Sequence, residues 1–263
     1  MPVASPAVLV SIDGLRPDAL ALTSCPTLES LRRRGCWTLA ATSVMPSITL
    51  PVHVSMFHAV PPTRHGITTN DWQPMARPLP GLADVAKAAG LASAFFYNWE
   101  PIRDLSRPNA LEFSYFCHNE WTEDGDQVIA VEAVRYLAAN RPDLLFVYLG
   151  TLDAWGHDHG FMSDAYLRHL EWVDAALGTL LAALPPEATT LVTSDHGGHE
   201  RAHGTDMPED MTVPWFIAGP GIRAGHEIQA PVNIVDTAPT LARVLGLKPD
   251  RQWEGKCPEE IWS

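Results

Sequence analysis

The stretch from Val192 to Gly204, VTSDHGGHERAHG, concentrates residues that can bind a metal ion. Asp195 and His196 directly follow an apolar run, and the two glycines after them let the backbone turn. A carboxylate and an imidazole placed together at a strand end are hard to explain by packing. His199 and His203 can each swing back toward this pair, and spacing alone does not separate them. We therefore expect a metal site at this stretch.

Two further groups of polar residues follow apolar runs elsewhere in the chain. Asp13 comes directly after the run from Ala7 to Ile12, although an Asp-Gly turn after a strand is common without any catalytic role. Asp153 and His157 are four residues apart, so on a helical turn they share a face and can chelate one cation. A loop with a helix N-cap explains that pair at least as well when it is considered alone. Ligands bind beyond the carboxyl ends of strands in open α/β sheets, so the three groups are expected to converge.

Carboxylates and imidazoles with one hydroxyl and no thiolate suit zinc, with manganese as a substitute. Two such cations about 4 Å apart clamp an in-line displacement at phosphorus. Thr49 offers the nucleophile, because it lies in a proline-bracketed turn at a predicted helix start, where N–H groups and the helix dipole favour an oxyanion. A neighbouring divalent cation lowers the pKa of its hydroxyl. The alternative role of Thr49 is an N-cap, which is compatible with catalysis.

The elements that must position these residues alternate between short apolar runs and helical patterns. This alternation is typical of βαβ units and predicts one α/β domain over residues 1–263 with a largely parallel sheet. Strands are predicted at Ala7–Ile12, Trp37–Thr42, Ala92–Tyr97, Leu144–Leu149, Thr189–Thr193 and Val213–Ala218. Helices are predicted at Pro26–Arg34, Val52–Ala59, Leu82–Ala89, Asp126–Asn140, Ser163–Leu184 and Asp236–Leu245, and residues 151–159 are predicted to be a loop.

Two irregular stretches are expected near the site. Residues 61–80 are rich in proline and turn residues and are predicted to form an ordered active-site loop. Residues 100–124 are acidic and aromatic and are interpreted as a surface or lid element. Aromatic residues that could stack a base or aryl group, or simply pack, are Trp72, Trp99, Phe116 and Trp121. Arg64 and Arg77 are the loop cations that could face a phosphate dianion.

Composition limits the classes of partner. The formal net charge of −13 argues against binding to polymeric nucleic acid or to an anionic membrane. The first apolar run is too short for a signal peptide or a membrane span, so a cytoplasmic protein is expected. The four cysteines, without CxxC spacing, are expected to be reduced. Oligomeric state leaves no signal in the sequence.

The residues, taken together, resemble the alkaline phosphatase superfamily and within it the nucleotide pyrophosphatase/phosphodiesterase branch. The matching segments, in chain order, are SIDGLRPD from Ser11, PSITLPVH from Pro46, HGITTN from His65, DAWGHDHG from Asp153, SDHGGH from Ser194, HGT from His203 and VDTAPTLARVLG from Val235. Each segment is short, but their joint order is specific and extends from Val8 to about Leu247. The resemblance implies a three-layer α/β/α sandwich with a largely parallel central sheet.

The resemblance also implies roles for individual residues. One cation would be bound by Asp13, Thr49, Asp195 and His196, and the other by Asp153, His157 and His203. Asn70 matches the asparagine that holds a phosphoryl oxygen together with the backbone N–H of the nucleophile. His203 is preferred to His199 because it is followed by Gly204. His53 and His65 are expected to anchor the nucleophile loop, and His159 and His199 to act behind the ligands or on substrate.

The implied activity is hydrolysis of small phosphate esters through a phosphothreonine, with a preference for diesters. Sulfatases of the superfamily are excluded because Thr49, Pro51 and His53 stand where their formylglycine motif would be. Only six residues separate His196 from His203, where relatives carry a long insertion, so substrate-recognition elements of the larger relatives are expected to be missing. Hydrolysis of phosphomonoesters or phosphonates is the alternative activity. A non-catalytic metal-binding module is a third hypothesis, which the complete set of ligands and nucleophile disfavours.

Overall fold

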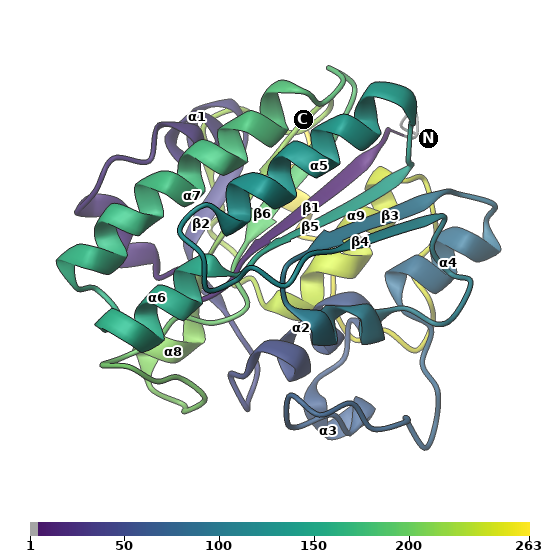
Figure 1. The fold of residues 1–263 in the computed structure, drawn as a ribbon. Coiled ribbons are helices and arrows are strands. Elements are labelled where there is room, and N and C mark those ends of the chain that lie inside the picture. Colours follow the sequence, from purple (N-terminus) through teal and green to yellow (C-terminus); the bar gives the residue numbers. More distant parts are fainter. Residues whose placement is uncertain (1–4) are drawn as a thin grey trace.

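A single eight-stranded sheet runs through the computed structural model, which describes residues 5–263 (Figure 1). Its strand order is β4-β3-β5-β1-β6-β7-β2-β8. The strands are β1 (Ala7–Ile12), β2 (Cys36–Thr42), β3 (Ser93–Tyr97), β4 (Phe113–Phe116), β5 (Leu144–Leu149), β6 (Thr189–Thr193), β7 (Thr212–Ala218) and β8 (His226–Glu227). Within the described residues, β7 is antiparallel to both of its neighbours and the other pairs are parallel.

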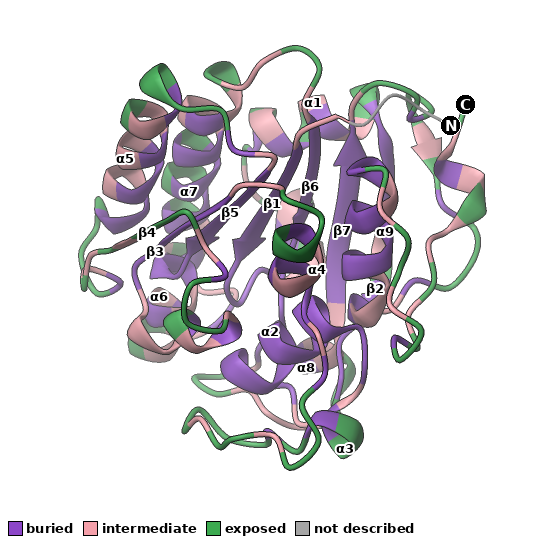
Figure 2. Ribbon diagram, turned by 90° about the vertical axis from the view of Figure 1, so that its right-hand side faces the viewer, coloured by how far each residue is buried: buried purple, intermediate pink, exposed green. Residues whose placement is uncertain are grey.

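Helices cover both faces of this sheet. One face carries α1 (Pro26–Arg34), α5 (Gly125–Ala139) and α7 (Asp164–Ala182), and the other carries α2 (Thr49–His58), α4 (Leu82–Ala88) and α9 (Thr237–Val244). The shorter helices are η1 (Pro17–Ala21), α3 (Pro62–His65), η2 (Glu100–Leu105), α6 (Thr151–His159), α8 (Pro208–Met211), η3 (Ile234–Asp236) and η4 (Glu259–Ile261). Figure 2 shows the strands buried between the helices, with exposed residues along α4 and α5, whereas α2 is buried throughout. The predicted three-layer α/β/α sandwich is confirmed.

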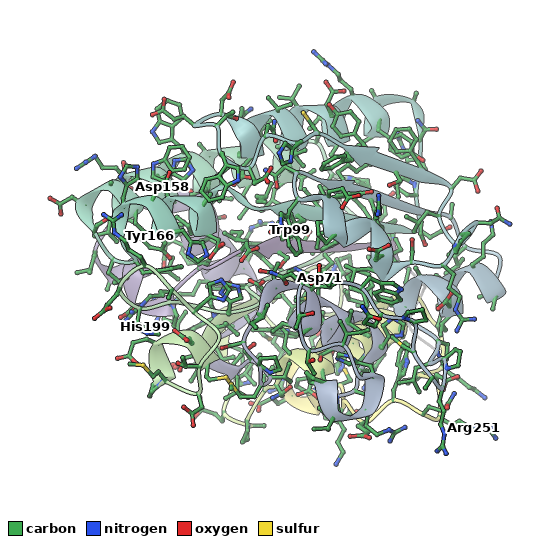
Figure 3. All side chains as sticks on the ribbon, turned by 60° about the horizontal axis from the view of Figure 1, so that its bottom comes forward. Asp71, Trp99, Asp158, Tyr166, His199 and Arg251 are labelled. Atoms are coloured by element: carbon green, nitrogen blue, oxygen red, sulfur yellow. The ribbon has the colours of Figure 1, made fainter. Side chains whose placement is uncertain are left out.

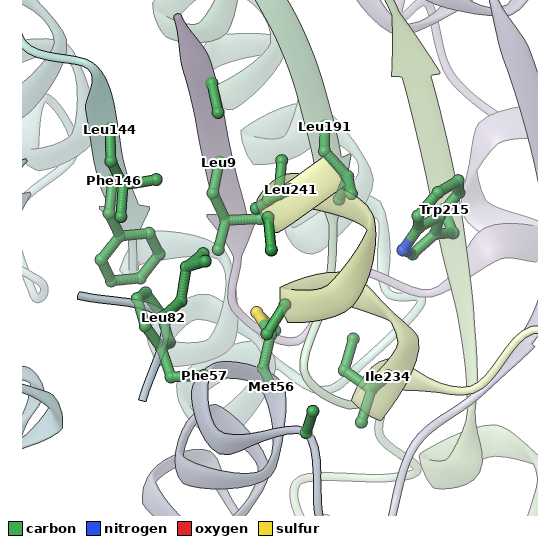
Figure 4. Packing of buried hydrophobic residues seen from close by; sticks show 14 of the residues in the cluster. Leu9, Met56, Phe57, Leu82, Leu144, Phe146, Leu191, Trp215, Ile234 and Leu241 are labelled. Atoms are coloured by element: carbon green, nitrogen blue, oxygen red, sulfur yellow. The ribbon is translucent and has the colours of Figure 1, made fainter. Parts of the chain in front are cut away.

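The alternation of side chains along the strands divides the apolar core into two layers. Val8, Val10 and Ile12 of β1 pack toward α1, α5 and α7, whereas Leu9 packs toward α2 and α9. Figure 4 shows the second layer, where Leu9 lies among side chains of neighbouring strands and of Met56 in α2. Burial on both faces explains why the strands read as continuous apolar runs in the sequence.

The sheet topology places the polar groups together. β5, β1 and β6 are adjacent and parallel, and Ile12 at the end of β1 pairs with Leu149 at the end of β5. Asp13 follows β1, the helix α6 follows β5 and Asp195 follows β6, each within two residues of the strand end, so the three meet at one edge. Figure 1 shows that α2, α6 and α8 lie at this end of the sheet.

Several local predictions differ from the structure. Residues 151–159 form the helix α6 rather than a loop, and α2 begins at Thr49, with Ile48 as its N-cap residue. The stretch 100–124, expected to be irregular, contains η2 and the edge strand β4, which pairs with β3 and stacks Phe116 on Tyr97. Helices in the described part of the chain are all too short or too polar to cross a membrane.

Candidate active site

Three carboxylates converge at the ends of β1, β5 and β6. Asp13 and Asp195 are fully buried, and Asp153 lies in the first turn of α6. One oxygen of each carboxylate is buried without a hydrogen-bond partner: Oδ1 of Asp13, Oδ1 of Asp153 and Oδ2 of Asp195. Buried acceptors are almost always paired in folded proteins, so three unpaired ones in one place indicate that a positively charged group belongs between them.

Three imidazoles face these carboxylates. His196 Nε2 lies 3.2 Å from Asp13 Oδ1 and 3.4 Å from Asp195 Oδ2. His157 Nε2 lies 3.2 Å from Asp153 Oδ2, because residues four apart share one face of α6. His203 Nε2 lies 3.8 Å from Asp153 Oδ1, and its ring stacks on that of His196 at 3.7 Å. The loop after β6 therefore contributes His196 beside Asp13 and Asp195, and His203 beside Asp153.

Backbone carbonyls fix the tautomer of all three imidazoles. Each ring donates its Nδ1–H to a carbonyl oxygen, so Nε2 is the ring nitrogen that faces the carboxylates and can bind a metal ion when it carries no proton. The acceptors are Gly197 (2.8 Å) for His196, Arg201 (2.8 Å) for His157 and Ser47 (2.9 Å) for His203. Such a hydrogen bond on the remote ring nitrogen is the usual arrangement around metal-binding histidines.

The donor atoms form two overlapping groups of the size that a cation requires. Ligand atoms of Asp13, Asp195 and His196 all lie within 4.8 Å of one another, and so do those of Asp153, His196 and His203. His196 thus takes part in both groups. Carboxylate oxygens with imidazole nitrogens, and no thiolate, fit zinc or manganese. The residues therefore fit a pair of divalent cations.

The charges of the cluster explain its pKa shifts. Burial raises the pKa of Asp13 well above its usual range, and the nearby carboxylates raise it further. Burial and the charge of Asp153 raise the pKa of Asp195 to about 7. The hydrogen bond to Asp153 raises the pKa of His157 to about 9, whereas burial lowers that of His196 to about 3. Like charges held together in a low-dielectric site disfavour ionisation, so cations would stabilise the ionised carboxylates.

Thr49 lies next to this cluster. It is buried, and its Oγ1 is 3.3 Å from His196 Nε2. Most backbone N–H groups in the first turn of α2 are already used. Leu50 N–H donates to Asn70 Oδ1 at 3.0 Å, Val52 N–H donates to the carbonyl of Ile48, and Pro51 has no N–H. The remaining donor is the N–H of Thr49 itself.

Asn70 is oriented by the same contact. Its Oδ1 accepts the Leu50 N–H, so its amide N–H groups point away from that bond. The side chain is exposed, on the loop between α3 and α4. The structure thus brings Asn70 to the N-terminus of α2, twenty residues away in the chain.

Two predicted anchors, His53 and His65, hold α2. His53 donates Nδ1–H to the carbonyl of Thr49 at 2.8 Å and accepts a hydrogen bond from the Ser11 hydroxyl at 2.9 Å. Burial lowers its pKa to about 4, so the ring is neutral. His65 Nε2–H donates to Ser55 Oγ at 2.9 Å. Both rings fix the helix that begins at Thr49.

Sequence reasoning missed Tyr148. Its buried hydroxyl donates a hydrogen bond to Asp13 Oδ2, whereas the other oxygen of that carboxylate, Oδ1, has no hydrogen-bond partner. Because Tyr148 alternates with core residues along β5, its position in the sequence looks like that of any packed aromatic residue. The only signal was its closeness to the carboxyl end of a strand.

The other predicted contacts lie in different surroundings. His199 Nδ1 pairs with Asp210 Oδ1 at 2.7 Å rather than with the carboxylate cluster. Arg64 pairs with Glu254 at the surface. In Figure 3, Asp158 and His199 lie to one side of the molecule, whereas Asp71 and Trp99 lie nearer its middle.

The four predicted stacking aromatics and His159 have mixed environments. Their contacts and exposures are as follows: Trp99 approaches Tyr148 with ring centroids 6.4 Å apart, Trp72 packs against the core, Phe116 stacks on Tyr97, Trp121 is 54% exposed, and His159 approaches Trp155 at 6.0 Å. Arg77 lies on the loop between α3 and α4.

Comparison with known proteins agrees with this geometry. Residues 7–207 match the family model of type I phosphodiesterase / nucleotide pyrophosphatase. The chain belongs to this family. The matched segment contains every residue of the carboxylate and imidazole cluster, together with Thr49 and Asn70. The match confirms the nucleotide pyrophosphatase/phosphodiesterase branch that the motifs predicted.

Relatives of this type I phosphodiesterase / nucleotide pyrophosphatase family member include larger proteins. Ectonucleotide pyrophosphatase/phosphodiesterase family member 1 of Rattus norvegicus is 25% identical over 218 residues, which cover 73% of this chain and 24% of that protein. A phosphopentomutase of Symbiobacterium thermophilum is 30% identical over 135 residues, or 51% of this chain and 33% of the relative. The chain therefore matches a quarter to a third of the length of these curated relatives.

Solved structures share the fold. Murine ectonucleotide pyrophosphatase/phosphodiesterase 5, an inactive form in complex with AMP, matches with a TM-score of 0.82 at 18% identity, covering 98% of this chain and 100% of that chain. The phosphonate monoester hydrolase of Agrobacterium radiobacter matches with a TM-score of 0.77 at 16% identity, covering 98% and 77%. Both have the same sandwich architecture.

Proposed function

We propose that the chain hydrolyses phosphodiesters of small organic molecules through a covalent phosphothreonine at Thr49, with two divalent cations bound beside it. Zinc is the expected metal, and manganese is a substitute. The observation that carries the proposal is the convergence of three unpaired carboxylate oxygens and three imidazole Nε2 atoms next to the Thr49 hydroxyl. Membership of the phosphodiesterase/pyrophosphatase family supports it.

Two sets of side chains would hold the cations. Asp13, Thr49, Asp195 and His196 would hold the first, and Asp153, His157 and His203 the second. The overlap of the two groups at His196 supports two ions that lie close together. When bound, the cations supply positive charge that lowers the pKa of the Thr49 hydroxyl and of water and neutralises charge on the leaving oxygen.

Thr49 attacks phosphorus from the N-terminus of α2. Its Oγ1 forms a bond to phosphorus while the bond from phosphorus to the leaving alkoxide breaks, and the leaving oxygen gains a proton in exchange for the one that the Thr49 hydroxyl loses. The products are an alcohol and a phosphothreonine that still carries the second ester group of the substrate. A water then attacks phosphorus from the opposite side and releases Thr49 and the phosphomonoester. The hydrogen bond from His53 to the Thr49 carbonyl holds the nucleophile in place during both steps.

Two donors are placed to stabilise the equatorial phosphoryl oxygens. The backbone N–H of Thr49 is unpaired at the start of α2, and the amide group of Asn70 has its oxygen committed to Leu50. Donors that are held in position before the reaction need no reorganisation, and each such donor typically contributes about 3 kcal/mol. The helix dipole of α2 adds to the same effect.

The preference for diesters rests on the family match, and the pairing of one loop arginine agrees with it. A monoester dianion gains from an additional nearby cation, but the guanidinium of Arg64 is paired with Glu254. The murine relative in complex with AMP suggests that one ester group of the substrate is a nucleoside. The net charge of −13 disfavours polymeric nucleic acid. The cytoplasmic location stays a prediction.

The test is a comparison of kcat/KM on four substrates: a bis-aryl phosphate, an aryl phosphate, an aryl phosphonate monoester and a dinucleotide. We expect the diesters to be fastest, and chelation to abolish turnover that zinc or manganese restores. Thr49→Ala should lose turnover and keep most of its metal binding, because three ligands of the first cation remain, whereas Thr63→Ala, which replaces an exposed threonine in α3, should behave as wild type. Faster hydrolysis of the monoester would refute the diester preference, and near-normal turnover by Thr49→Ala would refute the nucleophile.

A further inference from the structure

A buried carboxylate outside the metal cluster sits at the N-terminus of α6. Asp126, in the first turn of α5, is 3% exposed. Its Oδ1 accepts hydrogen bonds from Asn98 Nδ2 at 2.8 Å and from the Thr151 N–H at 3.2 Å. Its Oδ2 accepts one from the Thr151 hydroxyl at 2.7 Å. All these contacts are to residues distant in sequence, so the carboxylate joins three separate elements.

Asp126 and Asn98 together accept hydrogen bonds from the backbone N–H groups at the start of α6. Thr151 is the first residue of that helix, and its N–H would otherwise lack an acceptor. Asn98 Oδ1 accepts the N–H of the preceding Gly150 at 3.0 Å. A carboxylate at a helix N-terminus also interacts favourably with the helix dipole. The pair therefore fixes where α6 begins.

A second contact holds the same helix against α7. His169 donates its Nε2–H to Thr151 Oγ1 at 2.7 Å, since the hydrogen of that hydroxyl is directed to Asp126. The ring of His169 stacks on Trp155, with centroids 3.9 Å apart and planes within 9°. Trp155 lies in α6 two residues after Asp153. Figure 1 shows α6 beside the end of α7.

We propose that Asp126 is a positioning residue, which through Thr151 holds α6 so that Asp153 and His157 face the second cation. The inference rests on the proposed two-metal function. Asp153 is only two residues beyond Thr151, so a movement of the helix start moves the ligand directly. A displacement of about 1 Å at a preorganised site is enough to weaken it substantially.

The chain contains a matched control. Asp174 in α7 is 1% exposed and accepts the backbone N–H groups of Thr27 and Leu28, both at 2.9 Å, at the start of α1. It therefore performs the same local task for a helix that carries no residue of the cluster. Loss of its charge should cost stability in the same way without reaching the metal site.

The experiment compares Asp126→Asn and Asp174→Asn in the full chain. Zinc affinity is measured by competition with a chelating indicator, and stability by thermal unfolding of the metal-free protein. We expect both variants to unfold at lower temperature, but only Asp126→Asn to bind one zinc equivalent about 10-fold more weakly, with the other equivalent unchanged. Added zinc should then restore the turnover of Asp126→Asn.

Two results would overturn the inference: unchanged zinc affinity in Asp126→Asn, or an equal loss in Asp174→Asn. If Asp126→Asn does not fold, Thr151→Val removes only the bridging hydroxyl, and the same comparison applies to it. The affinity measurement does not depend on turnover. A wild-type protein that binds two equivalents but forms no phosphothreonine would refute the proposed mechanism and leave this inference standing.

Discussion

Asp195→Asn should stabilise the metal-free protein. Oδ2 of Asp195 is buried without a hydrogen-bond partner, and so is Oδ1 of the neighbouring Asp13. An amide in place of the carboxylate removes one negative charge from the cluster and can donate a hydrogen bond to Asp13. Oδ1 can still accept the N–H of Gly14, which lies 3.3 Å away. The same change removes a metal ligand, so it should abolish much of the stabilisation by zinc.

The pKa of Asp195 sets the magnitude and the pH range. Burial and the charge of Asp153 raise this pKa from 3.8 to about 7. The folded state therefore binds a proton that the unfolded state has lost between these pH values, and the free energy of unfolding falls as pH rises through that interval. Three pKa units correspond to about 4 kcal/mol. The advantage of Asp195→Asn should grow by up to this amount between pH 4 and pH 8.

The assay is urea unfolding of chelated wild type and Asp195→Asn across that pH range, repeated with zinc. The difference in unfolding free energy between the two proteins isolates Asp195, because the buried histidines titrate in both and their effect cancels. We expect the metal-free variant to be the more stable at pH 8 and the two to converge near pH 4. With zinc at 100 times the dissociation constant of each site, wild type should gain about 2.7 kcal/mol per bound cation and the variant far less. A pH-independent difference between the metal-free proteins would refute the reasoning.

Three further predictions concern single contacts. Asn70→Ala should lower kcat about 100-fold with unchanged zinc affinity, because it removes a phosphoryl donor; a change in affinity alone would contradict that role. His203→Ala should empty the second site and leave one zinc bound by metal analysis, whereas His196→Ala should weaken the site beside Thr49, so identical behaviour of the two variants would contradict the two groups. Tyr148→Phe should weaken zinc binding about 10-fold in a chelator titration, because Asp13 Oδ2 loses its donor; wild-type affinity would show that the hydroxyl is dispensable.

The sequence predicted the convergence of the carboxylates for a physical reason. Asp13 directly follows β1, and Asp195 follows β6 after one intervening residue. Both strands are buried, and such strands are visible as apolar runs. The alternation of helices and strands implies parallel strands, whose carboxyl ends share one edge. The adjacency of β5, β1 and β6 was not deducible from the chain, yet it is what places Asp153 beside the other two.

Other features depend on contacts that leave no local pattern. Asn70 reaches the start of α2 across a proline-rich loop, and only the resemblance to a family pointed to it. Tyr148 looks like a core residue of β5, because alternation places every second side chain on the same face. The strand β4 has four residues with partly exposed side chains, and its pairing with β3 determines its structure more than its composition does.

The polar network behind α6 was also invisible in the sequence. Asp126 was predicted as the first residue of a helix, a common place for an acidic side chain. Its carboxylate instead serves the start of a different helix, through Thr151. Contacts of this kind join residues twenty-five positions apart, and periodicity carries no information about them.

The central claim is that the phosphoryl group passes through Thr49, and acid-quenched mass spectrometry during turnover tests it most directly. The metal-loaded protein is mixed with excess diester, quenched within the first turnovers and digested, and the peptide that contains Thr49 is sequenced. We predict an adduct on Thr49 with the mass of a phosphate that still carries one ester group of the substrate, its appearance on the serine in Thr49→Ser, and its absence in Thr49→Ala. Rapid turnover with no phosphorylated Thr49 at any quench time, together with an active Thr49→Ala variant, would contradict the account.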